Sequence, residues 1–92
     1  MPSGAVHLIA SGRVQGVGFR YFVRQKALSM GIKGWVRNLG NGDVEILAEA
    51  DNYVLDFFVE AVRTGSSFAN VDNLHEDWRE PSGKFSTFDI AF

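Results

Sequence analysis

Residues 5–31, AVHLIASGRVQGVGFRYFVRQKALSMG, decide the predicted fold, because the spacing of the apolar residues changes within them. Residues 5–11 alternate in the manner of a strand, and Gly12 follows as a stop. From residue 19 to residue 30 the apolar residues recur every three or four positions, which predicts a helix that Gly31 ends. The stretch therefore predicts a strand, a glycine-containing loop and a helix.

Two further apolar runs, residues 32–39 and 43–50, lie on either side of an Asn41-Gly42 pair. Asn-Gly between such runs favours a tight hairpin, because both residues tolerate the positive φ that the turn requires. The two runs therefore predict an antiparallel pair of strands. Glu45 and Glu49 are interpreted as solvated charges opposite the buried face of the second run.

The remainder of the chain predicts one more helix and two more strands. A wide apolar face indicates a helix that starts at Asp51 or Asn52, either of which can cap it, and that ends at Gly65. Residues 69–78 form a weaker strand candidate in which a bulge is possible. Residues 88–92 alternate as a final strand.

The resulting order, β-α-β-β-α-β with a short extra strand, predicts the α+β class. It matches the ferredoxin-like arrangement, a mostly antiparallel sheet with two helices packed on one face. The rule of right-handed crossovers favours a first strand that lies beside the third and the last, away from the second. The first two strands then run in the same direction, so we expect Asn38 to lie at the same end of the sheet as Arg20.

The length and composition restrict the class of protein. The 92 residues are enough for one domain, residues 1–92, of which residues 1–4 are expected to be disordered. The absence of cysteine excludes a disulfide scaffold and thiolate metal sites. No run approaches the roughly 18 apolar residues that span a bilayer. We expect a soluble, cytoplasmic monomer with no membrane partner.

The charge is divided unevenly between the two halves. Residues 1–42 carry a net charge of +6 and hold no acidic residue, whereas residues 43–92 carry −8. This asymmetry suggests that the first half surrounds an anion-binding surface. The alternative is that folding intermixes the halves and cancels the field.

The loop between the first strand and the first helix, residues 12–20 (GRVQGVGFR), is the strongest candidate for such a surface. Gly16 and Gly18 permit the positive φ that turns successive N–H groups toward an anion beside a helix N-terminus. Arg20 adds a planar cationic group. Asn38 adds an amide that does not titrate. The alternative for the loop is an ordinary glycine-rich turn from strand to helix. The alternative for Asn38 is a residue that stabilises the hairpin turn.

Other chemistries have less support in the sequence. His7 and His75 lack further ligands at metal-binding spacing, so no metal site is expected. The loop lacks the Gly-Lys-Ser/Thr of a nucleoside triphosphate site. No general base is evident near the loop, and no cofactor is expected.

Residues 12–20, together with GWVRN at 34–38 and GDVE at 42–45, resemble the acylphosphatase family. The resemblance extends from the first strand to Phe88-Asp89-Ile90. It implies a small ferredoxin-like domain that hydrolyses acyl phosphates to a carboxylate and inorganic phosphate without a metal.

The resemblance also implies residue roles. Arg20 would bind the phosphoryl oxygens and Asn38 would position the attacking water. The usual prolines after the second helix are replaced by Ser66-Ser67, so this loop is expected to be more flexible. The phosphate would be held through backbone N–H groups of Gln15, Gly16, Val17, Gly18 and Phe19.

Two other functions stay open. The first is a non-catalytic ferredoxin-like module that binds a phosphorylated or nucleic-acid partner. The predicted sheet lacks interleaved exposed aromatic residues, since Trp35 alone is a poor stacking platform, so no nucleic acid is expected. The second is a carbamoyl phosphate-handling module of a larger enzyme, which a chain of one domain disfavours.

Overall fold

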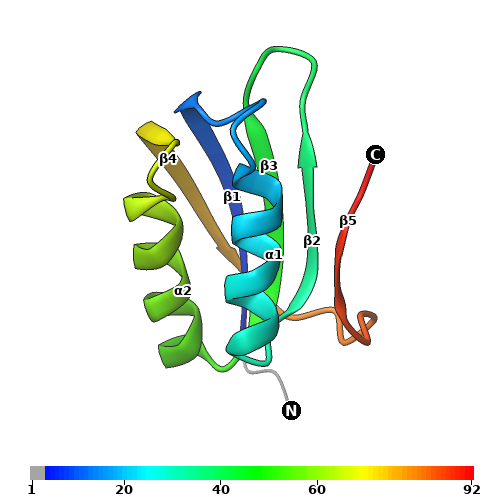
Figure 1. Cartoon of the computed structure of the whole chain (residues 1–92). Helices are drawn as coiled ribbons and strands as arrows, with labels where there is room; N and C mark the ends of the chain where they lie inside the picture. Colours follow the sequence, from blue (N-terminus) through cyan, green and yellow to red (C-terminus); the bar gives the residue numbers. More distant parts are fainter. Residues whose placement is uncertain (1–3) are drawn as a thin grey trace.

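The computed structural model describes residues 4–92, and in it the chain forms five strands and two helices (Figure 1). The elements are β1 (Gly4–Arg13), α1 (Phe19–Ser29), β2 (Lys33–Asn38), β3 (Val44–Ala50), α2 (Asn52–Thr64), β4 (Asn70–Arg79) and β5 (Phe88–Ile90). Every element that the sequence predicts is present.

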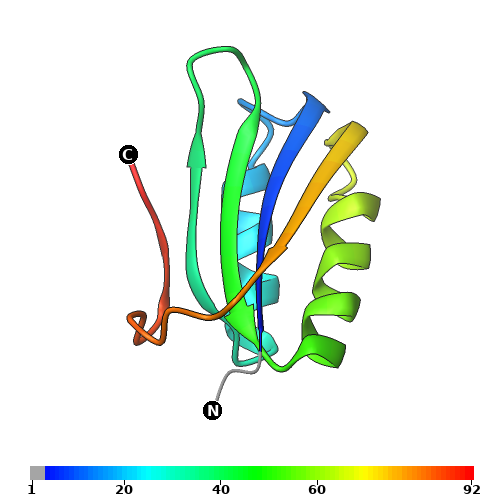
Figure 2. The same ribbon diagram turned by 180° about the vertical axis from the view of Figure 1, so that it is seen from behind.

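The strands form one mixed sheet in the order β4-β1-β3-β2-β5. As predicted, β1 lies beside β3 and away from β2; its other neighbour is β4 rather than the final strand, and it pairs antiparallel with both neighbours. The final strand β5 differs from the prediction, because it pairs in parallel with β2 at the other edge. Figure 2 shows the connection from β4 crossing the open face of the sheet, near its lower end, to reach that edge.

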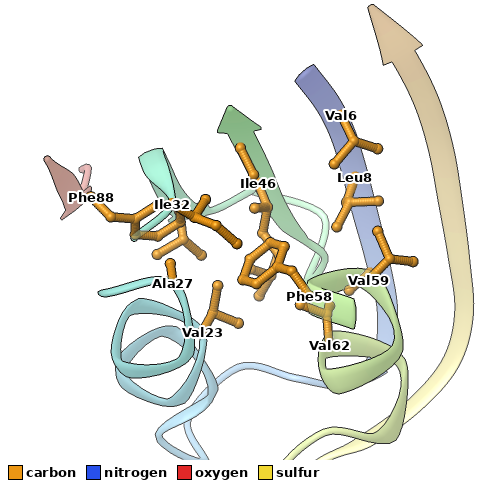
Figure 3. Packing of buried hydrophobic residues seen from close by; sticks show 14 of the residues in the cluster. Val6, Leu8, Val23, Ala27, Ile32, Ile46, Phe58, Val59, Val62 and Phe88 are labelled. Atoms are coloured by element: carbon orange, nitrogen blue, oxygen red, sulfur yellow. The ribbon is translucent and has the colours of Figure 1, made fainter. Parts of the chain in front are cut away.

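The two helices cover one face of the sheet and leave the other open (Figures 1 and 2). Apolar residues from β1, β3 and the helices meet between these layers, among them Leu8, Ile46, Phe58 and Val62, which are fully buried (Figure 3). Phe88 of β5 joins this core and meets the Phe58 ring edge-on. The burial of the Phe88 side chain in this core stabilises β5 in its position beside β2.

The weak apolar pattern at residues 69–78 has a structural explanation. β4 is an edge strand with only one neighbour, β1, and most of its residues are exposed. It therefore needs few apolar side chains. The bulge that the sequence allowed occurs where the register shifts opposite Ser11 and Gly12 of β1.

Two expectations need correction. Gly4 is the first residue of β1 and pairs with Ala50, so it is ordered, whereas residues 1–3 lie outside the described residues. Glu49 is not a solvated charge, because only 4% of its surface is exposed. Its carboxylate accepts hydrogen bonds from the N–H and hydroxyl of Ser82 and from the N–H of Gly83.

Candidate active site

The connection from β1 to α1 is a five-residue loop, residues 14–18, which we call the glycine loop. Gly16 and Gly18 adopt φ angles of 74° and 77°, in the left-handed region. A Cβ added at either position would meet nothing within 4 Å, so the requirement for glycine lies in the backbone conformation. Gly18 is also the N-cap of α1, and no side chain caps the helix there.

The N–H groups of the glycine loop have no acceptor in the part of the chain that the structure describes. No hydrogen bond donated by a backbone N–H of residues 14–18 is found within residues 4–92. The first N–H groups of α1 are likewise free of intrahelical partners, as at every helix start. Unpaired N–H groups in a left-handed turn beside a helix N-terminus form a site suited to an anion.

A small cavity of about 90 Å³ opens at this loop, and it brings the two predicted catalytic side chains together. Arg20 comes from the first turn of α1. Asn38 comes from the end of β2, where it pairs with Val44, which in turn pairs with Ala10 of β1. The cavity is lined by Val14, Gly16, Gly18, Phe19, Arg20, Tyr21 and Asn38.

Neither Arg20 nor Asn38 uses its polar side-chain atoms within the described part of the chain. Across residues 4–92, neither the guanidinium of Arg20 nor the amide of Asn38 makes a hydrogen bond or an ion pair. By contrast, Arg37 is paired with Glu45, which shows that folding intermixes part of the charge of the two halves. Arg20 keeps its positive charge free for a ligand.

The side chain of Gln15 turns to the hairpin. Its Nε2 donates to the carbonyl oxygens of Leu39 and Asp43, each at 2.8 Å. These bonds tie the glycine loop to the hairpin that follows Asn38. The predicted role of Gln15 concerned only its backbone N–H. No sequence pattern indicates the side-chain role, because the acceptors are main-chain atoms far along the chain.

Two other predicted residues hold the loop by packing. Phe19 is 1% exposed and stacks on Phe22, with the ring centroids 6.1 Å apart, and Val17 packs against the core. Only their backbone N–H groups are therefore offered to a ligand. Tyr21 lines the cavity but was not predicted as a site residue. Its position next to Arg20 in the first turn of the helix could have indicated that it lies at the site.

The only resolved pKa shifts in the described residues lie elsewhere. Burial alone would raise the pKa of Glu45, but hydrogen bonds from His7 and Arg37 outweigh it and hold that pKa below its usual value. No group of three or more metal-ligating side chains was found among residues 4–92. A larger hollow of about 560 Å³ at the opposite end of the sheet is lined by Asp56 and Glu80 as well as by Arg79. Because Arg79 is already paired with Asp77, this hollow suits an anion less well.

The comparisons with known proteins agree with this geometry. The family model described as acylphosphatase matches residues 6–90. The chain belongs to the acylphosphatase family. This membership confirms the resemblance inferred from residues 12–20 and 34–45, and it supports an enzyme that hydrolyses acyl phosphates.

Individual relatives cover almost the whole chain. An acylphosphatase of Caldanaerobacter subterraneus is 46% identical over 85 residues, which are 92% of this chain and 94% of the relative. One of Bacillus velezensis is 48% identical over 86 residues, 94% and 96% of the two chains. The crystal structure of acylphosphatase from Bacillus subtilis superimposes with a TM-score of 0.93, at 42% identity, and covers 97% of this chain and 99% of that one. Within residues 4–92, no helix has the length and apolar character needed to cross a membrane.

Proposed function

We propose that this chain hydrolyses acyl phosphates to a carboxylate and inorganic phosphate, without a metal ion, at the glycine loop. The observation that carries the proposal is a convergence on one cavity of about 90 Å³: backbone N–H groups, Arg20 and Asn38 meet there, and none of them has a hydrogen-bond or ion-pair partner within residues 4–92. A cavity of this size suits a phosphoryl group and a water, so the acyl group extends outward.

Each part has a defined task in the proposed reaction. Backbone N–H groups of residues 15–19 and the guanidinium of Arg20 donate hydrogen bonds to the phosphoryl oxygens and neutralise their charge. The amide oxygen of Asn38 accepts a hydrogen bond from the attacking water and orients it toward phosphorus.

The chemical step needs no strong protein acid or base. The water oxygen bonds to phosphorus as the bond between phosphorus and the acyl oxygen breaks, and the electron pair leaves with the carboxylate. Because a carboxylate is a good leaving group, it departs without protonation. The proton of the water passes to a phosphoryl oxygen of the substrate.

The decisive experiment is hydrolysis of benzoyl phosphate in the presence of EDTA. We expect turnover by the wild type, competitive inhibition by inorganic phosphate, and loss of more than about 1,000-fold of the activity in Arg20→Ala, because binding and transition-state stabilisation are lost together. Arg24→Ala, which removes another arginine of α1, is the matched control and should stay active. Turnover that requires added metal, or full activity of Arg20→Ala, would overturn the proposal.

A further inference from the structure

We infer that Phe92 is a positioning residue that holds the guanidinium of Arg20 ready for phosphate, an inference that rests on the proposed function. The guanidinium carbon of Arg20 lies 5.7 Å from the centroid of the Phe92 ring. This distance is within the range of a cation–π contact. Phe92 is fully exposed to solvent, so this contact is a solvent-exposed one that buries almost none of the ring.

Arg20 differs from the arginines that have carboxylate partners. Arg37 is paired with Glu45, Arg63 with Glu76, and Arg79 with Asp77. A carboxylate beside Arg20 would compete with phosphate for the guanidinium and cancel its charge. An aromatic face attracts the cation without accepting its hydrogen bonds, so all five N–H donors stay available to the phosphoryl oxygens.

The path of the backbone through β5 places Phe92 near Arg20. β5 pairs in parallel with β2, and the N–H of Ala91 donates to the carbonyl of Val36 at 2.8 Å. The buried Phe88 anchors the start of the strand. The chain therefore follows β2 toward the end of the sheet where Asn38 lies (Figure 1). An ordered backbone next to Phe92 limits how far its ring can move from Arg20.

The test measures phosphate binding separately from catalysis. Calorimetry gives the Kd of inorganic phosphate, and benzoyl phosphate in EDTA gives kcat and KM, for wild type, Phe92→Leu and Phe92→Trp. Leucine keeps an apolar side chain but removes the ring, so we expect the Kd of phosphate to rise roughly two- to fivefold. Tryptophan has a stronger π face, so Phe92→Trp should bind phosphate at least as tightly as the wild type.

The matched control is Phe57→Leu, which changes another exposed phenylalanine, on α2, and should leave the Kd and the kinetics unchanged. Equal thermal stability of Phe92→Leu and wild type would separate positioning from folding. An unchanged Kd in Phe92→Leu would overturn the inference. A wild type that binds phosphate but hydrolyses nothing would overturn the proposed function alone, and the Kd ratio would then still decide the role of Phe92.

Discussion

The two ends of the sheet each gather backbone N–H groups, but the chain supplies an anion at only one of them. At the Glu49 site (Glu49, Ser82 and Gly83), the carboxylate accepts three hydrogen bonds of 2.8 to 3.0 Å. At the other end, the N–H groups of the glycine loop have no acceptor within the described residues 4–92. Backbone N–H groups therefore bind a carboxylate of the chain at the Glu49 site, whereas those of the glycine loop are left without an acceptor from the described residues.

The difference separates a structural anion site from the proposed catalytic one. Burial alone would raise the pKa of Glu49, but the hydrogen bonds from Ser82 and Gly83 outweigh it and hold that pKa below its usual value. The filled site fastens the connection between β4 and β5 to β3. Within residues 4–92 the glycine loop has no anion from the chain itself, so its exposed N–H groups are open to water or to an anion from solution.

The largest expected effect comes from placing a carboxylate in the glycine loop. Gly16→Asp adds a negative charge that lines the cavity, and Gly16→Asn adds the same shape without charge. Both residues tolerate the left-handed backbone better than other side chains. Two charges about 4 Å apart near a surface repel by about 4 kcal/mol, so we expect kcat/KM for benzoyl phosphate to be roughly 1,000-fold lower in the aspartate than in the asparagine variant.

Salt provides the control for this comparison. If charge causes the loss, raising the ionic strength should narrow the gap between Gly16→Asp and Gly16→Asn. Equal activity of the two variants at low salt would contradict an anion site at the glycine loop.

The next effect concerns stability and the Glu49 site. Glu49→Gln replaces a carboxylate oxygen by an amide group that cannot accept, and it leaves a part-buried donor of Ser82 or Gly83 without an acceptor at a cost of about 2 kcal/mol. For a domain of this size we expect Tm to fall by about 10 °C. Activity well below Tm should change little, because the Glu49 site lies at the other end of the sheet. A stable but inactive Glu49→Gln variant would contradict the division of roles.

The same pair of proteins gives a pH test with a defined sign. The folded pKa of Glu49 is lowered, so its contribution to stability is complete above the unfolded pKa of about 4.3 and is lost as pH falls through the folded value. The difference in free energy of unfolding between wild type and Glu49→Gln should be constant from pH 6 to 8 and shrink below about pH 4. Denaturant titrations at each pH measure it.

The sequence predicted the glycine loop better than the Glu49 site. Local patterns specify the loop, since Gly16, Gly18 and Arg20 lie within five residues of one another. The direction of the first two strands was enough to bring Asn38 to the same cavity as Arg20, as the structure confirms. The roles of these residues stay predictions until the variants are measured.

The Glu49 site was not predicted because Ser82 and Gly83 lie 33 and 34 residues after Glu49 in the sequence. Alternation along β3 places Glu49 on the open face, where a charge is normally solvated. Its burial depends on how the connection after β4 folds, and no local pattern specifies that path. For the same reason, a three-residue strand such as β5 gave no sign that it would pair with β2.

The smallest expected effect is that of replacing Glu45, the other glutamate on the same face of β3 as Glu49. Glu45 also has a lowered pKa, but its partners are the side chains of His7, at 2.7 Å, and Arg37. The Arg37 side chain is 46% exposed and can turn to water when the carboxylate is removed, whereas the backbone N–H groups of Ser82 and Gly83 cannot leave without unfolding the loop. We therefore expect Glu45→Gln to lower the free energy of unfolding by less than about 1 kcal/mol, and the loss to shrink in high salt. Urea titrations of Glu45→Gln and Glu49→Gln side by side measure the contrast, and equal losses would contradict the view that backbone donors hold a carboxylate more firmly than mobile side chains do.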